Sequence, residues 1–230
     1  MTIKYHFFGR EIKIDREMSD RKVLNEGLKK GGFGGNRSLF LNQIHSNKIC
    51  VIDSPEKIHG DQNLPKVDAI VTNQTNINIG VVTADCAPIL FFCKKSNIIA
   101  AAHAGWKGAK AQIIKNTINA MKDLGATNIE AVIGPMIQQE SYEVSKEFYE
   151  DFLKEDKGNQ LFFALGKEEN KFQFDLNEYV KDRINEMKIG NIQNLKTDTY
   201  VNEDKYFSYR RSTHKNESDC GRNVSVISLG

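Results

Sequence analysis

Two histidines and a cysteine are the residues of this chain best suited to chemistry. His45 lies in the segment L-N-Q-I-H-S-N, Cys86 in V-V-T-A-D-C-A-P and His103 in A-A-A-H-A-G-W-K-G. A catalytic zinc ion typically takes three protein ligands and keeps a fourth position for water or substrate, and one Cys with two His is a known set of this kind. The three residues therefore predict a catalytic zinc site.

The spacing of these residues leaves two interpretations open. His45 precedes Cys86 by 41 residues and Cys86 precedes His103 by 17, so the three meet only if the tertiary fold brings them together. In the alternative, Cys86 is an ordinary buried thiol and each His satisfies local backbone groups. Spacing alone does not decide between them.

Two residues beside the candidate ligands have both a functional and a structural interpretation. Asp85 could orient a metal-bound His or a water molecule, because ligating imidazoles usually donate their other N–H to a carboxylate or carbonyl. It could equally be a turn residue that caps backbone amides. Trp106, the one tryptophan, could stack on a purine or serve as a packing anchor.

Near the C-terminus, Arg210, Arg211 and Arg222 form a basic cluster. Guanidinium groups bind phosphate bidentately, which makes the cluster a candidate phosphate site. The alternative is a solvated face in which these arginines pair with Glu217 and Asp219.

The elements that must position these residues alternate between strand and helix. Apolar runs at 77–84 and 88–93 predict two buried strands, with Asp85 and Cys86 at the polar corner between them. A third strand over 98–103 ends at His103, and Gly105 and Gly108 bracket the turn into a helix over 109–124 that Gly125 ends. His103 thus lies at a strand-to-helix switch, where α/β folds commonly bind ligands.

The second half of the chain continues the α/β pattern. We expect a strand over 129–133, a helix over 145–153 and a last strand over 224–229. Between them, Asp175 and Glu178 form a D-x-x-E capping pair at the start of a helix for which Gly190 is the expected end. The fold class is α/β.

Composition indicates one cytoplasmic domain over residues 1–230. No linker or low-complexity tract divides the chain. The net charge of +2, from 32 basic and 30 acidic residues, creates no field that would attract nucleic acid or an anionic membrane. No apolar run approaches the length of a membrane span, and four Cys in 230 residues do not resemble a disulfide framework. We expect small-molecule partners and a monomer or small homo-oligomer.

Ordered motifs from Asn42 to the C-terminus resemble those of the laccase-domain family, also called YfiH-like or multicopper polyphenol oxidase-like and described as purine nucleoside phosphorylases. They are N-Q-I-H, D-A-I-V-T, T-A-D-C-A-P-I-L-F-F, A-A-A-H-A-G-W-K-G, I-G-P-M-I, S-Y-E-V, F-D-L, F-S-Y-R-R and G-R-N-V-S-V-I-S-L. The resemblance implies a four-layer α/β/β/α sandwich with mixed sheets and His45, Cys86 and His103 as the metal ligands. Ser46, Lys107 and Asp198 depart from the family pattern without removing a ligand.

The resemblance further implies zinc-dependent phosphorolysis of adenosine, inosine, guanosine or methylthioadenosine, and deamination of adenosine in the same site. Zinc lowers the pKa of a bound water to ~7 and could supply hydroxide for attack at the purine C6. Lys107 and the arginine cluster could position phosphate under C1′ of the ribose.

Three alternatives stay open. One is a metal-independent hydrolase that edits peptidoglycan precursors, with Cys86 as nucleophile and His103 as base, and another is a non-catalytic metal-binding protein. The third, a copper-dependent polyphenol oxidase, conflicts with composition, because five His in all cannot hold a mononuclear and a trinuclear copper centre. Cu²⁺ would nevertheless bind the same three ligands in vitro.

Overall fold

The computed structural model describes residues 2–15, 19–35, 37–57, 65–218 and 220–230, so His59 and Asp219 lie outside the described part. The α-helices are α1 (Arg21–Leu28), α2 (Trp106–Lys110), α3 (Ile113–Asp123), α4 (Lys146–Glu155), α5 (Leu176–Asn185) and α6 (Tyr209–His214). The strands are β1 (Ile3–Phe8), β2 (Arg37–Leu39), β3 (Ile49–Ile52), β4 (Ala69–Thr72), β5 (Ile77–Thr83), β6 (Ala87–Cys93), β7 (Ile98–Ala104), β8 (Glu130–Ile133), β9 (Glu143–Ser145), β10 (Phe163–Leu165), β11 (Lys171–Phe174), β12 (Ile192–Asn194) and β13 (Asn223–Leu229).

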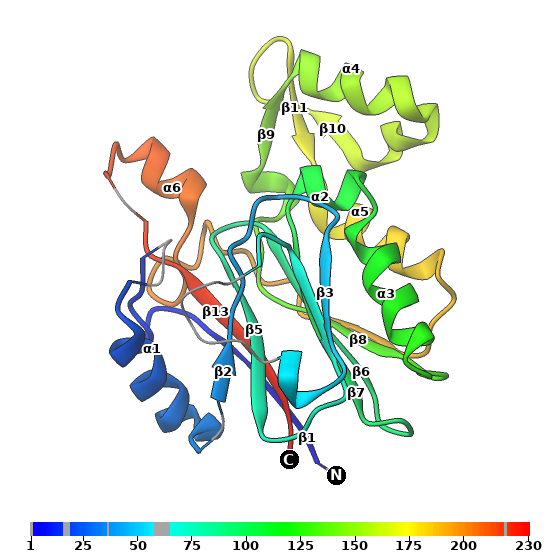
Figure 1. Cartoon of the computed structure of the whole chain (residues 1–230). Coiled ribbons are helices and arrows are strands. Elements are labelled where there is room, and N and C mark those ends of the chain that lie inside the picture. Colours follow the sequence, from blue (N-terminus) through cyan, green and yellow to red (C-terminus); the bar gives the residue numbers. More distant parts are fainter. Residues whose placement is uncertain (1, 16–18, 36, 58–64, 219) are drawn as a thin grey trace.

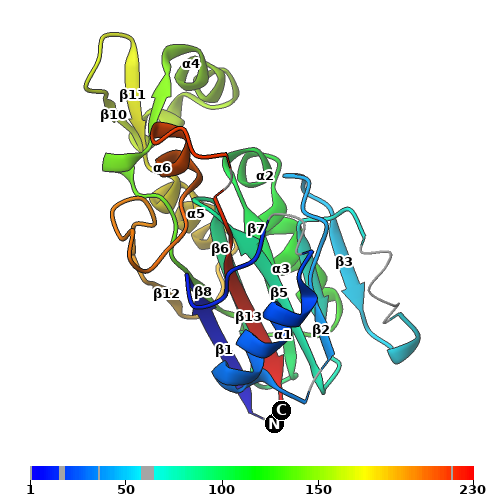
Figure 2. The same ribbon diagram turned by 90° about the vertical axis from the view of Figure 1, so that its left-hand side faces the viewer.

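Two mixed sheets form the middle of the molecule, and helices cover their outer faces (Figure 1). One sheet has the order β1-β13-β5-β2, with β2 parallel and the other pairs antiparallel. The other has the order β12-β8-β6-β7-β4-β3, with a parallel pair at each edge. Figure 2 shows α1 lying across the four-stranded sheet, whereas α3 and α5 pack on the six-stranded one. This arrangement confirms the α/β/β/α sandwich.

Three apolar clusters hold the layers together. The first lies between the six-stranded sheet and its helices, the second between the two sheets, and the third between the four-stranded sheet and α1. Strand side chains alternate between faces, so in β7 Ala100 and Ala102 pack under the helices while Ile99 and Ala101 face the other sheet. The same alternation turns His103 toward the space between the sheets. Both faces of β5, β6 and β7 are buried, which is why their sequences read as continuous apolar runs.

Two helix boundaries differ from the expectations. The helix expected over 109–124 is two helices, because α2 begins at Trp106 and the chain breaks at Gln112, whose left-handed backbone (φ 72°) cannot continue a helix. Gly108 therefore lies inside α2 rather than before it. Gly190 does not end α5: the helix ends at Asn185, and Lys188 takes the left-handed conformation (φ 48°) soon after. The cap by Asp175 is confirmed, since its carboxylate accepts the N–H of Glu178.

A smaller sheet of order β10-β11-β9 stands with α4 beyond one end of the sandwich, close to α2 and α6 (Figure 1). Its aromatic side chains continue the cluster under the helices, where Phe152 packs against Phe174 and Tyr179. Among the residues that the structure describes, none of the helices is both long enough and apolar enough to cross a membrane.

Candidate metal centre

His45, Cys86 and His103 come together at one end of the sandwich. His45 lies in the loop between β2 and β3, Cys86 at the corner between β5 and β6, and His103 near the end of β7. One ligand atom from each lies within 4.8 Å of the others, and Cys86 Sγ is 3.8 Å from His45 Nε2. His103 is buried, Cys86 half-buried and His45 exposed, so the group opens to solvent on the His45 side.

Asp68, immediately before β4, fixes the orientation of His103. Its Oδ1 is 2.9 Å from His103 Nδ1, and its carbonyl accepts the main-chain N–H of His103 at 2.8 Å. Burial raises the pKa of Asp68, but hydrogen bonds from His103 and Ser46 outweigh it and hold that pKa at about 2. The ionised carboxylate can only accept, so Nδ1 of His103 donates and Nε2 is left for a metal.

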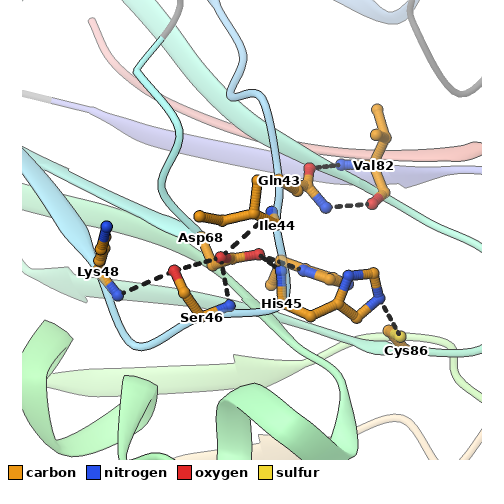
Figure 3. Close-up of polar contacts among 9 residues, drawn as sticks. Gln43, Ile44, His45, Ser46, Lys48, Asp68, Val82 and Cys86 are labelled. Atoms are coloured by element: carbon orange, nitrogen blue, oxygen red, sulfur yellow. Dashed lines mark hydrogen bonds and ion pairs between the residues drawn. The ribbon is translucent and has the colours of Figure 1, made fainter.

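The same carboxylate also holds the loop that carries His45 (Figure 3). Its oxygens accept the main-chain N–H groups of Ile44, His45 and Ser46 at 3.3, 2.9 and 2.6 Å, and Ser46 Oγ donates to Oδ2 at 2.7 Å. His45 has a left-handed backbone (φ 58°), which is costly for a residue with a Cβ. Three N–H bonds to one buried charge offset that cost and present the imidazole to Cys86.

Cys86 is poised as a thiolate. Burial raises its pKa, but the neighbouring His103 and His45 lower it well below the ordinary value, while the thiolate in turn raises the pKa of His103. Gly105 closes over the sulfur: a Cβ built there would lie 2.8 Å from Cys86 Sγ and 3.1 Å from His45 Cδ2. Glycine is required at this position because the chain passes directly against the ligands.

The donor set fits zinc. A tetrahedral zinc ion with one sulfur and two nitrogen ligands holds those atoms about 3.3 to 3.6 Å apart, close to the spacing observed between Cys86 and His45. A carboxylate on the far nitrogen of a ligating imidazole is the usual support of such a site. In the described part of the chain, this is the group of metal-ligating side chains that converges.

Asp85 does not contact the candidate ligand histidines. Its Oδ1 accepts the hydroxyl of Thr199 at 2.6 Å and its Oδ2 accepts the N–H of Arg210 at 2.7 Å, and burial raises its pKa. Asp85 has a left-handed backbone (φ 85°). Of the two roles expected for it, the contacts match that of a turn residue that caps backbone amides, here at the first turn of α6.

The three arginines expected to bind phosphate point to different places. Arg211 is buried and donates to the main-chain carbonyls of Thr199, Tyr200 and Tyr206. Arg222 donates to the carbonyls of Cys220 and Gly221. Both guanidiniums are engaged with the protein's own backbone, so Arg211 and Arg222 do not join Arg210 in one cluster in this structure, and their binding of phosphate stays a prediction. The salt-bridging alternative fails for Glu217, whose carboxylate accepts the hydroxyl of Ser212.

Arg210 instead lines an open cleft of about 470 Å³ beside the ligand group. Its walls include the aromatic rings of Trp106, Tyr142 and Phe148 and the basic side chains of Lys171, Arg210 and His214. Trp106 packs edge-on against Phe148, with 4.9 Å between ring centroids, and also lines the cleft, which leaves both of its expected roles open. Lys107 is exposed, with Nζ 5.4 Å from the centroid of the Trp106 ring.

Asp68, Gln43 and Tyr142 contribute to the site or to the cleft beside it but are not among the site residues expected from the sequence. The Gln43 side chain exchanges two hydrogen bonds with the backbone of Val82 and so ties the His45 loop to β5. Asp68 carried one usable signal, since a carboxylate opening the apolar run A-I-V-T needs a partner once it is buried. Lys171 and His214 carried none, because their positions depend on how distant elements pack.

Comparison with known proteins places these features in a family. A family model described as multi-copper polyphenol oxidoreductase laccase matches residues 19–230. A Rickettsia conorii protein named purine nucleoside phosphorylase RC0672 is 42% identical over 209 residues, which cover 90% of this chain and 85% of the relative. Escherichia coli purine nucleoside phosphorylase YfiH is 30% identical over 195 residues, which cover 84% and 74%.

Solved structures agree with the sequence relatives. The Neisseria meningitidis protein NMB0706 superposes with a TM-score of 0.76 at 29% identity, covering 91% of this chain and 80% of that one. The Bacillus licheniformis protein YfiH gives a TM-score of 0.80 at 22% identity, which supports the fold, covering 97% of this chain and 85% of that one. The chain therefore belongs to the laccase-like YfiH family.

Proposed function

We propose that this protein is a zinc-dependent purine nucleoside phosphorylase that also deaminates adenosine. The observation that carries the proposal is the convergence of His45, Cys86 and His103, with Asp68 bound to the far nitrogen of His103. The relatives' names supply the substrate class, purine nucleosides with phosphate. The zinc ion and the deaminase activity rest on the donor chemistry and on the resemblance of the motifs.

The chain's own residues would divide the work. His45, Cys86 and His103 hold the metal, which supplies a Lewis acid and acidifies water when bound. Asp68 keeps His103 in the required tautomer and holds the His45 loop in place. The aromatic wall of the cleft offers a surface for a purine. Because His45 is exposed, substrate can approach the ligands from the solvent side.

Metal content tests the first half of the proposal. We expect about one zinc per chain in protein purified without a histidine tag, and loss of stoichiometric zinc in Cys86→Ala with the fold retained. Cys50→Ala is the matched control, because Cys50 is a half-buried thiol on β3, outside the ligand group. Full zinc content in Cys86→Ala would refute the assignment.

Product analysis tests the second half. Adenosine with phosphate should yield adenine and ribose 1-phosphate by phosphorolysis, and inosine with ammonia by deamination. Both products should vanish in Cys86→Ala and persist in Cys50→Ala. Wild-type protein with full zinc that forms neither product would exclude the proposed activity while leaving the metal site intact.

A second candidate, a Cys/His hydrolase, is favoured by one specific observation. Asp68, His103 and Cys86 form a carboxylate–imidazole–thiol series in which the sulfur is poised as a thiolate, the arrangement of an activated nucleophile. Such an enzyme needs no metal. Removing zinc with a chelator should therefore abolish phosphorylase activity but preserve or increase thiol hydrolase activity. Release of amino acids from peptidoglycan precursors would measure the hydrolase activity.

A further inference from the structure

The cleft beside the ligand group is lined by aromatic rings, which we call its aromatic side, and by the basic residues Arg210, Lys171 and His214, which we call its basic side. We propose that Arg210, Lys171 and His214 bind a phosphate group there, next to a purine held against Trp106 and Tyr142. The inference rests on the proposed function, which it deepens: in place of the three-arginine cluster expected from the sequence, it uses residues from two elements, Arg210 and His214 of α6 and Lys171 of β11.

Arg210 is held in position by its surroundings yet keeps free donors. Its main-chain N–H is bonded to Asp85, its Nη1 donates to the carbonyl of Glu143 at 2.6 Å, and its guanidinium carbon lies 5.2 Å from the centroid of the Tyr142 ring. Among the described residues, no carboxylate lies within ion-pair distance of its guanidinium. A guanidinium has five N–H donors, so a preorganised fork is left for an anion.

The other polar groups of the cleft favour an anion too. Lys171 and His214 add a cation and an imidazole, and His214 is oriented by a 2.9 Å contact between its Nδ1 and the hydroxyl of Tyr200. The carboxylate of Glu143 is the opposing charge, but its Oε2 accepts the main-chain N–H of Lys167 at 3.0 Å. Two permanent cations thus line the cleft with one carboxylate that is already engaged, while Asp85 and Glu147 interact with Arg210 and Lys171 from outside the lining. The lining itself therefore favours an anion.

The aromatic side has the size and chemistry for a purine. The cleft volume of about 470 Å³ falls within the range of roughly 300 to 1,000 Å³ typical of small-molecule sites. Burial raises the pKa of Tyr142, so its hydroxyl stays protonated and can donate to a base or sugar. In the described part of the chain this hydroxyl has no assigned hydrogen-bond partner, which leaves it available to a ligand.

Three separate residues of the cleft lining connect it to the metal ligands. Trp106 follows Gly105, which packs against Cys86 and His45. The Cys86 thiolate acts electrostatically on Tyr142. Arg210 is bonded to Asp85, the neighbour of Cys86. A purine nucleoside in the cleft would therefore lie beside both the ligand group and the basic residues.

Trp106 allows a direct binding test, because it is the chain's one tryptophan and lines the cleft. Wild-type protein titrated with inorganic phosphate should show a saturable change in Trp106 fluorescence. Arg210→Gln should weaken binding by roughly tenfold or more, since it removes charge-assisted hydrogen bonds. Lys171→Ala, which leaves the Arg210–Glu143 contact untouched, should weaken it several-fold. Lys22→Ala, an exposed lysine on α1, is the matched control and should bind as wild type does.

The source of the phosphate is distinguished by a second titration. Adenosine 5′-monophosphate should compete with inorganic phosphate if both use the basic side, whereas adenosine should bind without displacing it. Equal affinity for phosphate in wild type, Arg210→Gln and Lys171→Ala would overturn the proposal, as would tight binding of adenosine with no response to either phosphate compound.

The test also separates this inference from the proposed enzyme activity. Cys86→Ala should lose zinc and turnover but keep phosphate binding at the basic side. Loss of phosphate binding in that variant would place the anion on the metal and count against Arg210, Lys171 and His214. Retained binding in a protein with no phosphorylase activity would leave the anion site standing and remove only the proposed reaction.

Discussion

Asp68 links two of the three candidate ligands, because its carboxylate oxygens bind different parts of the site. Oδ1 takes the imidazole N–H of His103 and the main-chain N–H of His45, and Oδ2 takes both the N–H and the hydroxyl of Ser46. The hydroxyl of Ser46 adds one more bond to the same carboxylate. One buried side chain therefore sets the tautomer of one ligand and the backbone of another.

Replacing Asp68 with Asn should weaken zinc binding more than it weakens the fold. The amide oxygen of Asn can still accept the N–H of His103. It lacks the negative charge that supports the ligating imidazole and the three main-chain N–H donors of the His45 loop, so we expect zinc affinity to fall about 10- to 100-fold. Competition with a chromogenic chelator measures the change. Asp151→Asn, on an exposed carboxylate of α4, is the control. Wild-type zinc affinity in folded Asp68→Asn would contradict the role assigned to Asp68.

At the scale of elements, the corner between β5 and β6 depends on its contact with α6 and with the segment before it. Asp85 accepts from Thr199 and from the first turn of α6, while Ser208 caps the same helix at the N–H of Arg211. The corner that presents Cys86 is thus supported by residues more than 110 positions later in the chain. Local sequence around Cys86 contains no sign of that support.

The variant Asp85→Asn should lower stability and leave zinc affinity less affected than Asp68→Asn does. The N–H₂ of the Asn side chain would face one of the two groups that donate to Asp85, and a buried donor without an acceptor lowers the free energy of unfolding by about 1 to 3 kcal/mol. Denaturant unfolding of metal-free protein measures the stability, and the chelator competition measures the affinity. Zinc loss without destabilisation would instead return Asp85 to a role in orienting the metal ligands.

At the scale of the whole molecule, the strands at the centre were predictable and the loops that carry the site were not. β5, β6 and β7 are buried on both faces, so their sequences are long apolar runs bounded by polar corners. The His45 loop instead owes its shape to a carboxylate 23 residues away. The sequence also does not predict how two adjacent arginines are oriented, since Arg210 faces the cleft and Arg211 faces the interior. The tertiary fold decides such orientations, and residue type does not report them.

The arrangement of the described histidines yields a prediction about the oxidase activity that the family description suggests. Among the described histidines, His6 packs against Phe8 and His214 contacts Tyr200, so two of them, His45 and His103, belong to the ligand group. His59, the remaining one of the chain's five His, lies outside the described residues. Cu²⁺ binds N and S ligands more tightly than Zn²⁺ does, so added copper should occupy the same three residues. A lone copper there has no trinuclear partner for the full reduction of dioxygen.

We therefore expect oxidation of phenolic dyes to be weak, to rise with added copper and to disappear in Cys86→Ala. Dioxygen consumption measured against copper content per chain tests this expectation, with Cys50→Ala as the control that keeps the ligand group. Fast reduction of dioxygen to water, in proportion to bound copper, would require a multicopper centre that two converging histidines and one cysteine cannot build. That outcome would overturn the assignment of zinc as the working metal and of nucleosides as the substrates.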